Sequence, residues 1–393
     1  MALTDAQRNS NLDLRYYEQT AYGEVPSTPT LISLRATRET FKINKKSVEH
    51  NIIGTRQKEG IYKVAEDFGG GFSGALAWGE FDPFFEGLMG ADFTAVTVTA
   101  TDISFAIGDS SINSVGAGFG SLLAGMWLLV SGTSAHNGLW YVASKSSSSK
   151  LILSRGVTSA GVTMTVSTEA AGASMTVKAN HLRQGDTLKS YGFERKNTDN
   201  DTFDYWNGFV VDQIKIDLNG DDLVMLEVSG VGKAADLNNS ATVSGSVTAA
   251  SALAPINSTN NLTRVYDGTA ILTDELVSAS LTLKANARNR TSLGNATPTG
   301  AAQGKLTVTG TEEFYFITNA RRQAMQDHTA KSQYFILKDP AASKFLILTI
   351  TNLYYMDLTN SAEDTESDTL ERYSIDASKD STYLQTVTID SLS

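Results

Sequence analysis

The sequence contains no cysteine, and it has only four histidines and six prolines among 393 residues. The absence of cysteine excludes disulfide frameworks, thiolate zinc sites and cysteine nucleophiles. The longest strongly apolar window, residues 122–130, is far too short to cross a bilayer, so we expect no membrane insertion. The histidines do not have the spacing of metal ligands; they are His50, His136, His181 and His328.

The chain also lacks the motifs of catalytic and cofactor sites. The glycines of residues 69–74 resemble a phosphate-binding loop, but no Lys-Ser or Lys-Thr pair follows them. The acidic segments 199–204 and 219–222 do not continue to the Gly and distal Glu of an EF-hand loop. A nucleophile elbow, an HExxH motif and paired catalytic carboxylates are missing too. We therefore predict that the protein is not an enzyme and uses no metal or cofactor.

Basic charge is scarce, because 32 Lys and Arg stand against 43 Asp and Glu and leave a net charge of −11. Binding to phosphate backbones needs clustered Lys and Arg, so we do not expect nucleic acid to be bound. The acidity serves either to repel nucleic acid or only to keep the protein soluble. No basic stretch followed by an apolar run occurs at the N-terminus, so we expect no secretory signal.

The composition favours short strands joined by turns, and one sequence pattern occurs twice along the chain. Residues 38–54 and 278–294 each read as an alternating strand, a basic Asn-rich stretch and a glycine, 240 positions apart (278 − 38). In each copy another strand then leads into a short helix. Placing Phe72-Ser73-Gly74 on Val308-Thr309-Gly310 gives an offset of 236 (308 − 72). We therefore predict a mainly β fold with a duplicated sandwich or barrel module that carries one short helix per copy.

Other segments differ from this repeat. An extra stretch of short strands broken by Gly, Ser and Asn-Gly turns interrupts the first copy and is expected to form a small inserted all-β domain. The polar N-terminal segment is expected to be an arm without a core of its own. The predicted division is an arm at 1–37, a first module at 38–92 and 184–236, an insertion at 93–183, a linker at 237–262 and a second module at 263–393.

Several segments, in this order, resemble the tail tube proteins of siphophages, which are bacteriophages with long non-contractile tails. In that family an N-terminal arm precedes a strand and a loop, and a glycine-rich strand then leads into a helix. The matching features here are Glu18, Gly23, Pro26 and Pro29, the Arg56-Gln57 loop, the segment 69–90, the segments 116–132 and 137–144 of the insertion, the segment 181–218 that follows them, and the segment 286–316, which resembles the second half of the tube protein.

The resemblance implies a structural virion protein, made in the host cytoplasm, that polymerises as stacked trimers with pseudo-sixfold symmetry. The tube would be a hollow, acidic-lined conduit through which DNA passes into the host without specific binding. Its partners would be further copies of the chain and the tape-measure, tail-tip and tail-terminator proteins. The resemblance implies that each half of the chain gives four strands to the inner wall, so three chains supply about twenty-four strands. At roughly 4.8 Å between strands and a tilt near 40°, these strands give a wall about 48 Å in diameter. A duplex roughly 20 Å wide fits inside it, and the insertion would lie outside.

The loops 44–71 and 284–307 and the arm are expected to order on a neighbouring ring, where their cations would pair with Asp364, Glu366 and Asp368. The candidates for contact between rings are Arg56, Gln57, Lys58, Arg288, Arg290, Tyr16 and Tyr17. The candidates for carboxylates that face the lumen are Glu80, Asp199, Asp201, Glu312 and Glu313.

Two other interpretations stay open. A tail terminator or a capsid-decorating virion protein would form a single ring and not a polymer. A glycan-binding surface β-protein would bind carbohydrate through the insertion, although the expected absence of a secretory signal and the duplication weigh against it.

Overall fold

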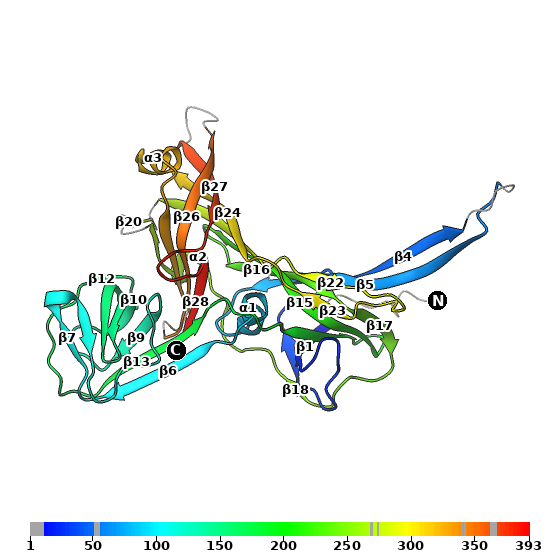
Figure 1. Ribbon diagram of the computed structural model, residues 1–393, viewed down its shortest axis with the longest axis horizontal. Helices are drawn as coiled ribbons and strands as arrows, with labels where there is room; N and C mark the ends of the chain where they lie inside the picture. The colour runs from blue at the N-terminus through cyan, green and yellow to red at the C-terminus, as the bar shows by residue number, and fades with distance from the viewer. Residues whose placement is uncertain are drawn as a thin grey trace.

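The computed structural model describes residues 12–50, 56–267, 270–272, 275–339, 341, 343–361 and 368–393. Strands far outnumber helices, so the predicted mainly β class is confirmed. Two β-modules lie side by side, and the inserted domain flanks the second module (Figure 1). At the other end of the molecule a hairpin of β4 (Lys42–His50) and β5 (Gly60–Ala75) extends away from the first module.

The first module consists of antiparallel strands paired in the order β1, β14, β15, β16, β5 and β4. β15 is long enough to belong to two sheets, since its first half pairs with β14 and its second half with β16. The remaining elements are β1 (Leu12–Gln19), β2 (Leu31–Leu34), β3 (Arg38–Glu39), α1 (Asp82–Met89), β14 (Ser190–Asn197), β15 (Thr202–Asn219), β16 (Met225–Gly232) and β17 (Ala234–Asn239).

The second module repeats this arrangement. Its strands pair in the order β19, β25, β26, β27, β24 and β21, and the long β26 takes the place of β15. A short helix follows β24 just as α1 follows β5. The elements are β19 (Leu262–Asp267), β20 (Ala270–Ile271), β21 (Leu276–Lys284), β24 (Thr307–Tyr315), α3 (Ala320–Gln326), β25 (Lys331–Lys338), β26 (Phe345–Ser361), β27 (Leu370–Ala377) and β28 (Val387–Leu392).

The bulges fix how the two modules correspond. The irregularity between Val211 and Gln213 on β15 recurs between Tyr355 and Leu358 on β26. Following the pairing outward from these bulges equates Gly70 with Gly310, 240 positions apart (310 − 70). The offset of 236 taken from the Phe-Ser-Gly and Val-Thr-Gly segments is therefore wrong, because it slips this strand by four residues.

The two modules join edge to edge through β15 and β21, which pair from Gln213 opposite Lys284 to Asn219 opposite Ser278. One antiparallel sheet therefore runs through both modules in the order β4, β5, β16, β15, β21, β24, β27, β26. A single apolar core lies beneath it, and α1 contributes Phe84 and Leu88 to this core. The shared sheet and core bind the two halves into one body.

The insertion has its own apolar core, which includes Phe105, Trp140 and Val177. It also docks on the second module, because β13 pairs with β28 and Trp127 packs among side chains of β25 and β26. Its strands are β6 (Thr94–Ala100), β7 (Ser104–Ala106), β8 (Ser111–Asn113), β9 (Trp127–Ser131), β10 (Gly138–Ser147), β11 (Lys150–Val157), β12 (Thr163–Met164) and β13 (Met175–Leu182), with a short 3-10 turn at Ile107–Asp109.

The N-terminal segment is not a free arm over its described residues. β1 pairs with β14 along its whole length, and β2 pairs with β1, so both belong to the first module. The segment between the modules also lies on the first module, where Val243 N and Thr242 Oγ1 donate to the buried Glu194. It contains β18 (Val247–Thr248) and leads into α2 (Ser258–Asn261). The sequence suggested neither contact, because both depend on partners far along the chain.

Candidate assembly surfaces

The continuous sheet has one apolar and one polar face, because its side chains alternate. On β21, Leu281 and Leu283 are buried in the core while the side chains between and beside them reach the other face. The polar face is rich in small hydroxyl side chains; these include Ser73, Ser229, Ser278, Ser280, Thr282, Thr309, Thr311 and Ser374. This polar face is the candidate inner wall.

Charges of both signs stand on the candidate inner wall. Lys215 Nζ lies 2.8 Å from Asp217 Oδ2, and Ser280 Oγ donates to the other oxygen of the same carboxylate at 2.6 Å. Ser374 Oγ donates to Asp357 Oδ2 at 3.1 Å. The strand alternation places six carboxylates and five cations on this face; they are Glu227, Asp217, Glu313, Asp376, Asp357 and Asp67, and Lys215, Lys284, Arg372, Arg38 and Lys42.

Only one of the five predicted lumen carboxylates lies on this face, and it is Glu313. Its neighbour Glu312 points into the core, is 1% exposed and accepts a 2.9 Å hydrogen bond from Gln333 Nε2. Burial raises the pKa of Glu312 to about 7. Glu80 is also buried and pairs with Arg35. Glu312 and Glu80 are therefore wrong as lumen residues.

The other two predicted lumen carboxylates, Asp199 and Asp201, lie at the turn between β14 and β15, outside the continuous sheet. The carboxylates that do stand on the polar face, such as Asp217 and Glu227, were missed. A signal was present, because Lys215 and Asp217 alternate with Ile214, Ile216 and Leu218 in the printed sequence.

Tyr16 and Tyr17 are wrong as contacts between rings, since both are buried in the first module. The ring of Tyr16 lies 4.9 Å from that of Phe84, and Tyr17 OH donates to Asn207 Oδ1 at 2.8 Å. Burial raises the pKa of each phenol to about 12. Both sit on β1, whose partner strand β14 follows only after the insertion, so the sequence did not show what would cover them.

The five remaining candidates for contact between rings are exposed. Arg56, Gln57 and Lys58 lie near the end of the β4–β5 hairpin, where Lys58 pairs with Glu49 of the same hairpin. Arg288 and Arg290 lie on β22 (Arg288–Arg290), which pairs with β23 (Gly300–Ala302). Of their proposed acidic partners, Asp364 and Glu366 lie outside the described residues and Asp368 is exposed.

Two strand edges end the continuous sheet. At one end, residues 357–361 of β26 pair with β27, and among the described residues no strand pairs with their other side. At the opposite end, β3 and β4 pair with β5 alone in the described structure. Unpaired edges of this kind are templates for pairing with another chain.

Nothing in the described residues suggests chemistry. No group of three or more His, Asp or Glu side chains is arranged to hold a metal ion in that part of the chain. Over the same residues, none of the helices is both long and apolar enough for a membrane span. A large β-sheet with two open edges and a hydroxyl-rich polar face is suited to edge-to-edge pairing with further copies of the chain.

Comparison with known families agrees with a role in assembly. Residues 9–389 match the family model of phage tail tube proteins, so the chain belongs to that family. A search of curated proteins gave no match. The chain is therefore a structural component of the virion that assembles with itself and with other tail proteins into the tail tube, and the prediction that it is not an enzyme is confirmed.

Proposed function

We propose that three copies of the chain close into a ring with pseudo-sixfold symmetry and that the rings stack into the hollow tube of a long non-contractile tail. DNA passes through this tube into the host. The observation that carries the proposal is the β15–β21 junction, which joins two modules of equal strand order into one sheet. The two open edges belong to the strands that correspond to β15 and β21, so the same junction can form between chains.

The correspondence of the modules names the residues that would meet. β26 corresponds to β15, and β3 with β4 corresponds to β21 at the offset of 240. The pairs Ile214–Leu283 and Lys215–Thr282 within the chain then become Leu358–Ile43 and Thr359–Lys42 between chains. Leu358 and Ile43 are only partly buried and pack against the margin of the core. Their contact would cover apolar surface at the junction.

The number of strands supports three chains per ring. Eight strands per chain in the continuous sheet give about twenty-four in a trimer, and at roughly 4.8 Å spacing and 40° tilt the backbone diameter is about 48 Å. A duplex roughly 20 Å wide passes without unwinding. Two chains would give only about 32 Å by the same geometry, which leaves little room once side chains line both walls.

The chemistry of the candidate inner wall supports passage without binding. On this face the six carboxylates (Glu227, Asp217, Glu313, Asp376, Asp357 and Asp67) slightly outnumber the five cations (Lys215, Lys284, Arg372, Arg38 and Lys42), and Lys215 is paired with Asp217. Phosphates are held by clustered cations through counterion release. A hydroxyl-rich wall with interspersed carboxylates gives DNA few such contacts, so we propose weak repulsion by a mildly acidic lumen.

The location of the insertion supports the same arrangement. It covers the face of β25, β26 and β28 that lies opposite the apolar core, whereas the candidate inner wall belongs to the sheet on the other side of that core. In the proposed ring the insertion therefore lies on the outside. We propose the tape-measure, tail-tip and tail-terminator proteins as the partners inside the tube and at its two ends.

A pair of cysteines tests the ring, because the chain has none of its own. We expect K42C combined with T359C to form disulfides between chains in the assembled protein, and the covalent products on a non-reducing gel to end at three chains. K42C with N360C is the matched control, since adjacent strand residues point to opposite faces. Negative-stain images of the same sample should show hollow tubes.

Other outcomes contradict parts of the proposal. Single rings that never stack would favour a tail terminator, and monomers that bind glycans would favour a surface protein. Absence of cross-links in assembled K42C/T359C protein would show that the ring closes through other edges. A covalent product of two or of six chains would replace the trimer with that number.

A further inference from the structure

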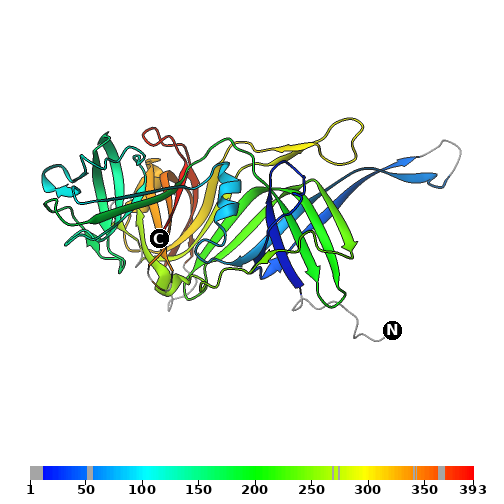
Figure 2. The ribbon, with the colours of Figure 1, turned by 90° about the horizontal axis from the view of Figure 1, so that it is seen from below.

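Two long connections correspond in the two modules. Residues 285–306 join β21 to β24, and we call them the loop arm. Residues 45–50 and 56–65 are the described part of the connection between the β3–β4 edge and the core-facing part of β5, and we call them the hairpin arm. In Figure 2 the loop arm, in yellow, reaches from the second module over the first, while the hairpin arm extends beyond the molecule.

The loop arm is seated on the first module by polar contacts along its length. Ala287 N donates to Asp212 Oδ1 at 2.6 Å. Asn289 Nδ2 donates to Gly232 O at 3.0 Å, and its Oδ1 accepts from Tyr22 OH. Ala296 O accepts from the amide of Glu66 at 2.7 Å. These contacts reach the first module at Asp212, Gly232 and Glu66. We call the surface around these three residues the seat of the loop arm.

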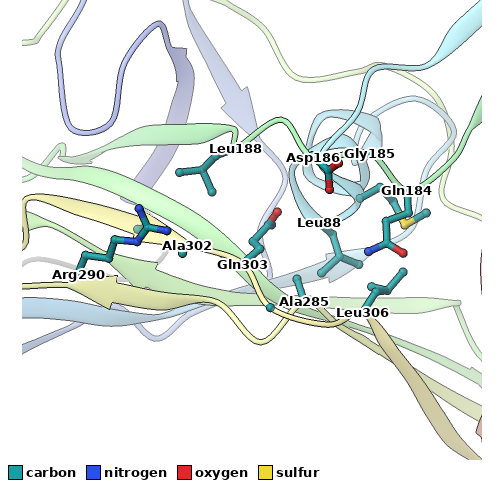
Figure 3. Close-up of a pocket in the computed structure, with 13 residues that line it drawn as sticks. Leu88, Gln184, Gly185, Asp186, Leu188, Ala285, Arg290, Ala302, Gln303 and Leu306 are labelled. Carbon is teal, nitrogen blue, oxygen red and sulfur yellow. The ribbon is translucent and has the colours of Figure 1, made fainter.

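The seat also includes the end of α1. Gln303 Nε2 donates to Gly87 O at 2.7 Å, and the gap beneath the loop arm is a cavity of about 370 Å³ (Figure 3). Leu88 of α1 and Leu306, the last residue before β24, both line this cavity. One module thus already receives the arm of the other within a single chain.

Among the described residues of the same chain, no comparable set of polar contacts holds the hairpin arm. It leaves the first module at the end opposite the second module (Figure 1). Four of its apolar side chains are between 50% and 62% exposed; they are Val48, Ile61, Tyr62 and Val64. An exposed group of large apolar side chains on a protruding element indicates a surface that is covered in an assembly.

The corresponding seat on the second module is open. When the two modules are aligned at their bulges, the residue of the second module that is equivalent to Asp212 is Met356. The residues equivalent to Glu66 and Gly232 are Leu306 and Ala377. All three of these residues line one cavity of about 370 Å³, together with His328 and Tyr354. Met356 is 46% exposed there. The three residues of the seat were chosen from contacts in the first module alone, and their equivalents in the second module all line the same cavity.

We propose that the hairpin arm of one chain lies in this cavity on the second module of the next chain in the same ring. The inference rests on the ring proposed above, because the β4 edge that pairs with β26 leads directly into the hairpin arm. Within the chain, Ala285 N donates to Asp212 O at 2.7 Å where the loop arm begins. The equivalent contact joins Lys45 N to Met356 O between chains, and brings Ser47 and Val48 to the cavity.

This arrangement explains why the two arms differ in sequence. The loop arm reaches its seat within the chain, whereas the hairpin arm must find a separate molecule and carries more apolar surface to do so. The ring then has six arm seats, three filled within chains and three between chains. In this proposal the hairpin arm joins neighbouring chains within one ring. The sequence had instead led us to expect that loop 44–71, which contains this arm, contacts a neighbouring ring.

A cysteine pair tests the lateral seat in the assembled full-length protein. We expect S47C combined with M356C to cross-link neighbouring chains on mild oxidation, with a ladder of covalent products that ends at three chains. A287C with D212C should cross-link within the chain and serves as the positive control. S47C with S146C, which lies on the exposed surface of the insertion, is the matched negative control.

Each outcome is decisive. A ladder that continues past three chains would overturn the proposal, because the arm would then connect rings along the axis. Cross-linking of K42C/T359C without cross-linking of S47C/M356C would overturn the arm seat and leave the ring intact. Failure of both pairs in assembled tubes would overturn the seat and the ring junction together. Circular dichroism of each variant should match the parent, since Ser47 and Met356 are exposed.

Discussion

The two modules share strand order and bulge positions, yet the same places in their interiors hold different chemistry. Phe72 and Phe193 of the first module lie with ring centroids 5.5 Å apart, and Tyr16 packs beside them. The corresponding residues of the second module are Glu312 and Gln333, joined by a 2.9 Å hydrogen bond, and Asp267. An aromatic cluster has become a buried polar one without changing the fold.

The comparison shows that the same module fold can be built around an aromatic centre or around a buried polar one. What the copies keep is backbone geometry. A Cβ added to Gly70 would lie 2.2 Å from Thr40 O, and one added to Gly310 would lie 2.3 Å from Ser280 O. Thr40 and Ser280 themselves correspond, 240 positions apart (280 − 40). Close backbone approach at one point and bulges at others set the strand register in both modules.

The largest change in the free energy of unfolding is expected when Phe72 of the first module is replaced by Glu, the residue type at the equivalent position 312 of the second module. F72E places a carboxyl among the aromatic rings of Phe81, Phe84 and Phe193. A buried charge without a partner costs about 3–5 kcal/mol, so the free energy of unfolding should fall by at least that amount. Urea denaturation followed by tryptophan fluorescence measures the change.

F72L is the control for this substitution, and it should cost only about 1 kcal/mol because it keeps an apolar side chain. If F72E is as mild as F72L, then the first module tolerates buried polarity and the contrast between the two centres has no energetic meaning.

Removing the charge from the second module should raise stability at neutral and higher pH. The folded-state pKa of Glu312 is raised from 4.5 to about 7 by burial, with Asp267 adding repulsion and Arg321 opposing it. The folded state therefore holds a proton that the unfolded state releases between about pH 4.5 and pH 7, and stability falls as pH rises through this window. E312Q should remove this loss, which is on the order of 3 kcal/mol above pH 7.

Denaturation midpoints of E312Q and the parent, measured from pH 4 to pH 8, check this expectation. The two curves should meet at the acid end and separate as pH rises. Parallel curves would mean that another group carries the pH dependence. Gln keeps an oxygen that can accept from Gln333, so the hydrogen bond survives in the variant.

The two equivalent glycines should respond unequally to the same change. Both G70A and G310A force a methyl group against a carbonyl oxygen. Gly70 also has a φ of +109°, whereas Gly310 does not have a positive φ. Backbone strain adds about 1–3 kcal/mol, so G70A should be the more destabilising by that margin. Thermal denaturation of the two variants compares them directly, and equal losses would show that the clash alone decides.

The smallest effect is expected at Glu313, the immediate neighbour of Glu312. Its side chain stands on the polar face, and among the described residues this side chain accepts one hydrogen bond, a long one from Ser278 Oγ at 3.4 Å. E313Q should therefore change the free energy of unfolding by less than about 0.5 kcal/mol. A loss comparable to that of a core substitution would contradict the assignment of the two faces of β24.

The sequence alone was sufficient for the fold class, the duplication and the absence of catalytic chemistry. Alternating strands, a helix after the second strand of each copy and the missing cysteine are local features, and they need no knowledge of distant contacts. The sequence could also have predicted that Glu312 faces the core, because Val308, Gly310, Glu312 and Phe314 fall on one side of an alternating strand.

Only the tertiary structure decided which strands are neighbours and in what register. It placed Tyr16 against Phe84, moved the repeat offset from 236 to 240 along β5 and β24, and laid residues 285–306 on the first module. Each of these depends on pairing between segments far apart in the chain. A one-residue slip in such pairing exchanges the two faces of a strand, and local sequence carries little information about it.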